Sequence, residues 1–170
     1  MPVSTLYAPW RMEYIQSLDH EKSDQCFLCE AAAADGEELR RRLVLWKTDQ
    51  SLVMINRFPY VHGHLLIAPR AHKAELGELN EAEGLDLHRQ TSAAIDLLKR
   101  AVSAQGFNIG VNIGRVAGAG VPGHVHQHVV PRWAGDNNFI AVVGEVRVVP
   151  QAISQLYDAL LKIRREMIGQ

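Results

Sequence analysis

Three histidines alternate between Gly123 and Pro131, in the order His124, His126 and His128. Alternate residues of a strand face one side of a sheet, so on a strand these imidazoles form a row spaced roughly 6.7 Å apart. Imidazole binds catalytic metals. It can also attack phosphorus as a nucleophile, giving a covalent phosphoramidate that a second nucleophile discharges. The third possibility is a polar strand face whose histidines are simply solvated.

The spacing of the row favours a nucleophile over a catalytic metal. A mononuclear catalytic metal commonly takes three protein ligands in tetrahedral geometry, and three successive alternating positions span too far for one ion. A pair of histidines two positions apart suits a metal better. We therefore expect one imidazole to be the nucleophile while the others orient it, bind phosphate oxygens and move protons.

A second cluster of candidate ligands begins with Cys26 and Cys29, a Cys-x-x-Cys pair. Such a pair is half of a zinc site or a redox pair. The polar residues before Cys26 do not predict the strand that precedes a thioredoxin-like redox pair. Zinc needs two further ligands, and His72 is available for one of them. Two partly buried thiols without a metal are the remaining alternative.

Glycines gather just before the histidine row. The segment Gly118–Gly123 formally matches the dinucleotide-binding fingerprint, but Pro122 and then an alternating strand follow, where the fingerprint requires a helix. We expect instead a glycine-rich turn over Gly114–Gly123. Its backbone N–H groups, at Gly118 and Gly120 in particular, can approach a phosphate closely. The alternative is a flexible hairpin connection.

Composition sets limits on the class of protein. Hydrophobic residues at 47% and charged residues at 22% are ordinary for one globular domain of 170 residues. Eighteen basic against nineteen acidic residues give a net charge of −1, which does not favour non-specific nucleic-acid binding. No apolar run approaches the roughly 20 residues of a membrane span, and Met1–Tyr14 lacks an apolar signal-peptide core. We expect a cytoplasmic protein that binds neither nucleic acid nor membrane.

The elements that must position these residues follow from the hydrophobic pattern. The order of strands, helix, strands and helix predicts an α+β domain with a mostly antiparallel sheet. A capping box at Asn80 begins a helix that Gly106 stops, and Pro150 suits the first turn of the last helix. The segment Ala31–Arg42 is either a short helix or a loop. The expected strands are Leu43–Trp46, Ser51–Asn56, His64–Ala68 (in the centre of the sheet), Phe107–Ile113 and Val125–Val130.

Three blocks carry a resemblance to a known family. His124–Val130 resembles the signature of the histidine triad (HIT) superfamily, apart from polar Gln127 in a usually apolar slot. Asn56–Pro69 is similar to the Asn-Arg…Pro-Gly-His stretch of fragile-histidine-triad-type members, with His62 where proline is usual. Pro131–Phe139 resembles the branch that includes bacterial diadenosine tetraphosphate phosphorylases and hydrolases. The resemblance covers nearly the whole chain.

The resemblance implies roles for particular residues. His126 is the nucleophile that attacks the α-phosphorus, and His128 and His64 flank the phosphate. The zinc-bearing members imply a structural zinc on Cys26, Cys29, His72 and His124, and Mg²⁺ can accompany the substrate. The other expected substrate contacts are Asn56 at the ribose or a nearby polar group, Asn112 near the phosphates, Gln127, and Trp133, which either stacks on a base or closes the sheet edge.

The resemblance also implies a fold and a function. The family fold is a five-stranded sheet with a long central helix and a C-terminal helix, usually as a homodimer. Residues 1–170 then form one domain, with an N-terminal extension over 1–25, a core with the triad over 26–135 and a C-terminal strand and helix over 136–170. We expect an enzyme that cleaves dinucleoside polyphosphates through a nucleotidyl-histidine, resolved by water or phosphate. The alternatives are a nucleoside phosphoramidase and a nucleotide-binding regulatory protein.

Overall fold

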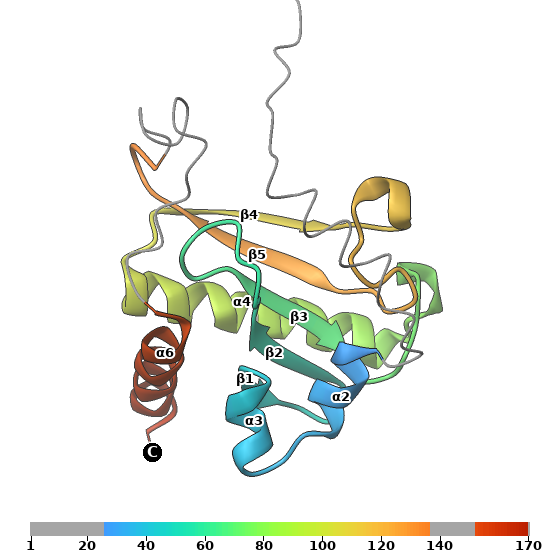
Figure 1. The fold of residues 1–170 in the computed structure, drawn as a ribbon, viewed down its shortest axis with the longest axis horizontal. Helices are drawn as coiled ribbons and strands as arrows, with labels where there is room; N and C mark the ends of the chain where they lie inside the picture. Colours follow the sequence, from blue (N-terminus) through green and yellow to red (C-terminus); the bar gives the residue numbers. More distant parts are fainter. Residues whose placement is uncertain (1–25, 137–151, 170) are drawn as a thin grey trace, which may run out of the picture.

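A computed structural model describes residues 26–136 and 152–169 of the chain (Figure 1). The described elements, in chain order, are α2 (Phe27–Ala33), α3 (Glu37–Arg41), β1 (Val44–Lys47), β2 (Ser51–Ile55), β3 (Leu65–Pro69), the 3₁₀ turn η1 (Leu76–Glu78), α4 (Glu81–Val102), β4 (Gly106–Val111), the 3₁₀ turn η2 (Arg115–Ala117), β5 (Gln127–Arg132) and α6 (Ile153–Ile168). None of the helices in these two ranges is long and apolar enough to cross a membrane.

The five strands form one sheet in the order β1-β2-β3-β5-β4, and every neighbouring pair is antiparallel. This confirms the predicted α+β class and the central place of β3, all five of whose residues are buried. The register sets Leu66 of β3 opposite His128 of β5, and Gly110 of β4 opposite His128 on the other side. His128 therefore lies in the interior of the sheet, between two paired strands.

The two faces of the sheet are covered by different helices. Helix α4 packs on one face, where apolar residues of β2, β3 and β5 join Leu97 and Leu98 in the larger core cluster. Helix α2 packs on the other face, over β1 to β3, around Leu28 and Leu52. Figure 1 shows α2 and α3 near β1 and β2, and the β4–β5 half of the sheet away from both. The face of the β4–β5 half that lies opposite α4 is therefore not covered by α2 or α3.

Helix α4 starts as predicted and ends sooner. Asn80 accepts a hydrogen bond from the Glu83 N–H, and the Glu83 carboxylate accepts one from the Asn80 N–H, which completes the capping box. The helix ends at Val102 because Ser103 takes a left-handed conformation, with φ of 51°. Our expectation that Gly106 stops the helix was wrong, since Gly106 already begins β4.

The histidine segment departs most from the expected pattern. Strand β5 begins at Gln127, so His124 and His126 lie before the strand rather than on it. The Val125 N–H donates to the Lys73 carbonyl, which belongs to the loop after β3. The predicted row therefore does not lie on one regular strand, because only His128 belongs to β5 while His124 and His126 precede it. The segment predicted as helix or loop forms the end of α2 and α3, and Pro150 lies outside the described residues.

Candidate active site and metal cluster

His126 is buried, with 5% of its surface exposed. Its Nδ1 lies 2.8 Å from the backbone carbonyl oxygen of His124. A carbonyl only accepts hydrogen bonds, so the Nδ1 of His126 must carry the proton and Nε2 keeps its lone pair. Burial also lowers the pKa of His126, which keeps the ring neutral at pH 7. The result is a nucleophilic nitrogen with a fixed direction.

His64 and His128 form a hydrogen-bonded pair, with 2.9 Å between Nε2 of His64 and Nδ1 of His128. The Nδ1 of His64 accepts a hydrogen bond from the Tyr60 N–H at 3.1 Å, which places the proton of His64 on Nε2. That proton is donated to Nδ1 of His128, so His128 carries its own proton on Nε2. One backbone N–H thus sets the tautomer of two imidazoles in succession.

His128 presents this Nε2–H beside the ring of His126. The ring centroids of His126 and His128 lie 5.1 Å apart. Burial, followed by the charge of His126, lowers the pKa of His128 to about 4, so this ring too is neutral at pH 7. The Nδ2 of Asn112 lies 3.5 Å from His128 Nε2, which brings Asn112 to the predicted region. Because both nitrogens carry a proton, they do not hydrogen-bond to each other. A lone pair and an N–H donor side by side suit attack on a phosphoryl group whose oxygens need hydrogen-bond donors.

Asn56 was predicted to contact the ribose or a nearby polar group, but its side chain is bonded within the protein. Its Oδ1 accepts the Phe58 N–H at 3.0 Å, and its Nδ2 lies 3.2 Å from Nδ1 of His64. Both ends of the amide are therefore engaged within the protein. The arrangement makes Asn56 a residue that orients His64 and fixes the turn after β2.

Two other predicted substrate contacts face away from the histidines. The Gln127 side chain accepts from the Thr91 hydroxyl at 3.2 Å, on the side of the sheet that α4 covers. Trp133 donates its Nε1–H to the Val102 carbonyl at 3.0 Å and packs against the larger core cluster. Of the two roles predicted for Trp133, this geometry favours the structural one.

The glycine-rich segment forms a compact turn. Gly118 has a φ of +85° and donates its N–H to the Arg115 carbonyl at 2.9 Å, which closes η2. A positive φ of this size is one that glycine adopts readily. Gly120 follows two residues later, and phosphate binding by Gly118 and Gly120 stays a prediction.

The four predicted metal ligands come together although they are distant in sequence. One donor atom from each of Cys26, Cys29, His72 and His124 lies within 4.8 Å of all the others. The Sγ of Cys26 is 3.2 Å from Nδ1 of His124, and the Sγ of Cys29 is 3.2 Å from Nδ1 of His72. Tetrahedral zinc with about 2.3 Å to sulfur and 2.0 Å to nitrogen separates neighbouring donors by roughly 3.3–3.8 Å. The cluster can therefore hold a metal ion of this kind.

The surroundings of the cluster fix its histidines. The Nε2–H of His124 donates to the Pro69 carbonyl at 2.9 Å, so its Nδ1 lone pair faces the sulfurs. A Cβ on Gly123 would lie 3.3 Å from Nε2 of His72, so glycine leaves room for that ring. Burial, then the hydrogen bond and charge of Cys26, raise the pKa of the Cys29 thiol to about 11. A bound cation reverses this preference because it favours the thiolate.

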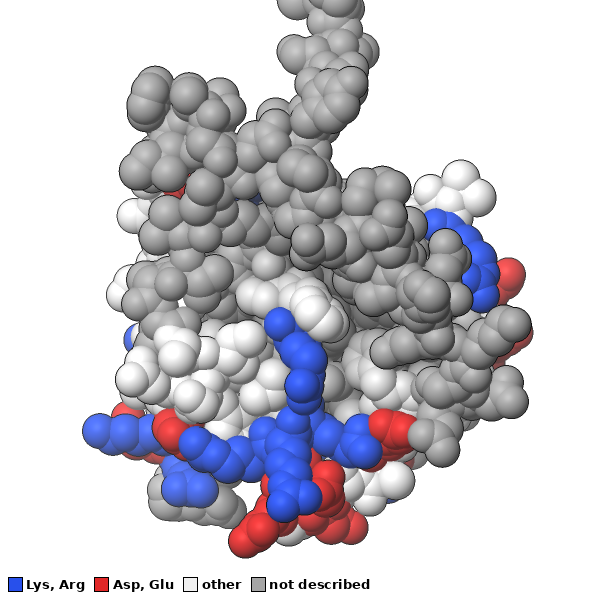
Figure 2. All heavy atoms as spheres, in the orientation of Figure 1, with Lys and Arg blue, Asp and Glu red and all other residues white. Residues whose placement is uncertain are grey.

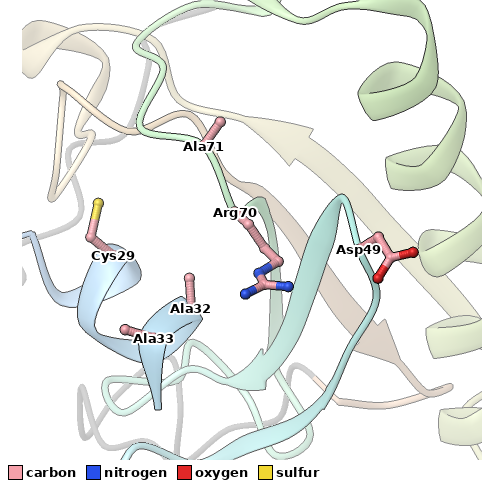
Figure 3. Close-up of a pocket in the computed structure, with 6 residues that line it drawn as sticks. All are labelled: Cys29, Ala32, Ala33, Asp49, Arg70 and Ala71. Atoms are coloured by element: carbon pink, nitrogen blue, oxygen red, sulfur yellow. The ribbon is translucent and has the colours of Figure 1, made fainter.

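A surface hollow of about 450 Å³ opens beside the metal cluster (Figure 3). Cys29 and two alanines of α2 line one side, and Arg70, Ala71 and Asp49 line the other. His64, His126 and His128 are not among its lining residues. Cys29 therefore borders this open hollow, which does not include His126.

Charges around α3 are mixed rather than of one sign, as Figure 2 shows near the bottom of the view. Arg40 pairs with Asp158, Arg41 with Glu38, and Arg42 with Glu30 and Glu38. Compensated arginines of this kind do not form an extended anion-binding surface.

One residue of the site, Tyr60, was not predicted from the sequence. Tyr60 lies with its ring centroid 4.5 Å from that of His64 and 5.6 Å from that of His128. Its place inside the Asn56–Pro69 block was a signal, but the spacing of residues does not reveal where a loop side chain points.

Comparisons with known proteins agree with this fold and site. The HIT domain family model matches residues 39–135. The chain is 33% identical over 154 residues to the AP-4-A phosphorylase of Mycobacterium tuberculosis (strain ATCC 25618 / H37Rv), covering 87% of this chain and 77% of that protein. It is also 33% identical over 93 residues to the asymmetrical bis(5'-nucleosyl)-tetraphosphatase of Schizosaccharomyces pombe (strain 972 / ATCC 24843), covering 55% of this chain and 50% of that protein.

Solved structures give the same fold. A hypothetical histidine triad nucleotide-binding protein from Sulfolobus tokodaii strain7 superposes with a TM-score of 0.63 at 27% identity, over 85% of this chain and 92% of that one. A Zn-bound histidine triad family protein from Mycobacterium smegmatis gives 0.61 at 22% identity, over 85% and 96%. Fold and site thus define an α+β protein with a group of hydrogen-bonded histidines at the starts of β3 and β5. The chain belongs to the HIT family.

Proposed function

We propose that this protein cleaves dinucleoside polyphosphates through a nucleotidyl intermediate on His126. The observation that carries the proposal is the orientation of that ring, whose Nδ1–H is held by the His124 carbonyl so that Nε2 keeps its lone pair. The relative with the longest match among those above is an AP-4-A phosphorylase, which supports this substrate class. A nucleoside phosphoramidase is the nearest alternative, because the same nucleophile would displace an amine.

In the first step, Nε2 of His126 forms a bond to the α-phosphorus and the bond from phosphorus to the bridging oxygen breaks. The electron pair leaves with the polyphosphate, which needs no proton at neutral pH. The ring becomes positively charged, and the His124 carbonyl stabilises that charge through the Nδ1–H. His128 donates its Nε2–H to a phosphoryl oxygen without giving up the proton.

In the second step, water or inorganic phosphate attacks the same phosphorus and the nitrogen–phosphorus bond breaks. The lone pair returns to Nε2 of His126, and the proton of an attacking water passes to solvent. Water gives AMP and ATP from diadenosine tetraphosphate, and phosphate gives ADP and ATP.

We also propose that Cys26, Cys29, His72 and His124 hold a structural zinc ion. Zinc at this place would tie the start of α2 to the segment before β5 and would supply no step of the reaction. The geometry of the donor atoms and the Zn-bound relative support this assignment. Mg²⁺ would accompany the polyphosphate substrate.

The test incubates the purified protein with diadenosine tetraphosphate and Mg²⁺, with and without inorganic phosphate, and identifies the nucleotides formed. AMP with ATP means hydrolysis, whereas ADP with ATP only when phosphate is present means phosphorolysis. The control is the His126→Asn variant, in which a polar amide without a ring replaces the proposed nucleophile. Tight binding without products over hours, or equal turnover by His126→Asn, overturns the proposal.

A further inference from the structure

The aromatic side chain of Tyr60 lies against both His64 and His128, the two histidines beside the proposed nucleophile. The ring of Tyr60 is tilted by 37° to that of His64, at a centroid distance of 4.5 Å. It is nearly parallel to the ring of His128, with an interplanar angle of 19° at 5.6 Å. The rings of His64 and His128 are themselves 5.1 Å apart, so the three rings form one compact group.

The loop that carries Tyr60 is held in place by its backbone. The Asn56 N–H donates to the His64 carbonyl at 3.0 Å, which closes the loop at its base. The Phe58 N–H donates to the Asn56 side chain at 3.0 Å. Gly63 has a φ of +81°, and a Cβ there would lie 3.2 Å from two core side chains. Tyr60 is therefore delivered to the histidines by a loop with little freedom, and it is 38% exposed at the rim of the site.

The two histidines differ in how much they depend on this ring. His64 is fully buried, and both of its nitrogens have hydrogen-bonding partners within 3.2 Å. His128 has one short hydrogen bond, at Nδ1, while its Nε2 is 3.5 Å from the Asn112 amide. A single hydrogen bond leaves an imidazole free to tilt about that bond, and packing against a flat ring restricts this tilt. His128 therefore depends on the Tyr60 ring for its orientation more than His64 does.

We propose that Tyr60 is a positioning residue, whose ring holds the His128 imidazole so that its Nε2–H points at the phosphoryl group. This inference rests on the proposed nucleotidyl transfer for its effect on rate. We assign this task to the aromatic face of the ring. The backbone N–H of Tyr60 sets the tautomers of His64 and His128, and its ring restricts the plane of His128. One residue thus acts on the histidine pair in two ways.

The kinetic test compares Tyr60→Phe, which keeps the ring, with Tyr60→Leu and Tyr60→Met, which remove it. We expect Tyr60→Phe to keep wild-type kcat. The two ring-free variants should lose about three- to tenfold in kcat, the effect of one aromatic contact, with KM within about twofold. Phe58→Leu, the same change two residues away on the same loop, is the matched control and should leave kcat and KM unchanged.

A spectroscopic test separates this inference from the reaction. Long-range ¹H–¹⁵N correlation spectra of the ligand-free protein report which nitrogen of each histidine carries the proton. All three proteins should show His128 as the Nε2–H tautomer, because each keeps the residue-60 backbone N–H that sets it. In Tyr60→Leu the His128 signals should shift and broaden relative to the wild type and Tyr60→Phe, because the ring is free to tilt. A wild type with no nucleotide turnover defeats the proposed reaction, while these spectra still decide the role of Tyr60. Unchanged His128 signals and kcat in both ring-free variants, or a Tyr60→Phe as impaired as they are, overturn it.

Discussion

Two histidines of the same segment, His124 and His126, are set to different tasks by the same device. Each donates one ring N–H to a backbone carbonyl, which leaves the other ring nitrogen with a lone pair. In His124 the donor is Nε2 and the lone pair of Nδ1 faces two sulfurs. In His126 the donor is Nδ1 and the lone pair of Nε2 remains for phosphorus. The comparison teaches that the position of a carbonyl, rather than the residue type, separates the proposed metal ligand from the proposed nucleophile.

The largest effect should come from His126→Ala, which removes the nucleophile. We expect turnover to fall by at least about 10⁴-fold, since loss of a covalent nucleophile is among the most damaging changes in an enzyme. Metal content and thermal stability should stay close to wild type, because the ligand atoms belong to other residues. Nucleotide assays, metal analysis and thermal melts measure the three quantities. A variant that lost its metal together with its activity would show that the two regions are not separable.

A smaller effect should come from Asn56→Ala, because the change acts through His64. Without the amide beside Nδ1, His64 and then His128 lose part of their orientation, and we expect kcat to fall roughly 10- to 100-fold. Gln127→Ala is the matched control, since its side chain bonds Thr91 on the opposite face. Its kcat should stay within twofold of wild type. Equal losses of kcat in both variants would contradict the assignment of faces.

At the proposed zinc site, Cys26→Ala should lower thermal stability more than it lowers catalytic activity. We expect the melting temperature to drop by roughly 5–10 °C, as loss of a structural metal worth a few kcal/mol implies. Activity at low temperature should be largely retained. A chelator should lower the melting temperature of the wild type and leave that of Cys26→Ala unchanged. A chelator effect of equal size in both proteins would place the metal elsewhere.

The smallest effect should come from the ion pair between Lys73, which follows the proposed metal ligand His72, and Glu83 of α4. Lys73, whose carbonyl accepts the Val125 N–H, pairs with Glu83 at the start of α4. The hydrogen bond from Lys73, then that from the Asn80 backbone, lowers the pKa of Glu83 below its ordinary value of 4.5. The pair therefore stabilises the fold above pH 4.5, and this contribution is lost as the pH falls through the lowered pKa.

Glu83→Gln tests this ion pair by thermal melts between pH 7 and pH 3. The variant should melt a few degrees below the wild type at pH 7, and the difference should shrink as the pH falls. Lys99, whose ion pair with Asp96 is exposed, offers the control Lys99→Gln, which should be nearly neutral. A constant difference across the pH range would mean that Glu83 contributes through its cap to Asn80 and not through its charge.

Much of the fold, and the identity of several candidate site residues, could be predicted from the sequence alone. Apolar alternation and turn residues predicted five strands at nearly their observed positions, and the Asn80 capping box marked the start of α4. The alternating histidines and the Cys-x-x-Cys pair singled out candidate residues, and the family resemblance joined Cys26 and Cys29 with His72 and His124, which the structure brings together. These features are local, because period, caps and turns depend on residues that are neighbours in the chain.

The tertiary structure alone decided how those residues are oriented. Cys26 and His124 are 98 positions apart, and the contact between them exists only once α2 packs on the sheet. Which nitrogen of each histidine carries the proton depends on carbonyls and an N–H, at Pro69, His124 and Tyr60, that no spacing predicts. Hydrogen bonds of this kind form between groups that folding brings within about 3 Å, and the pattern of side chains along the chain does not encode their directions.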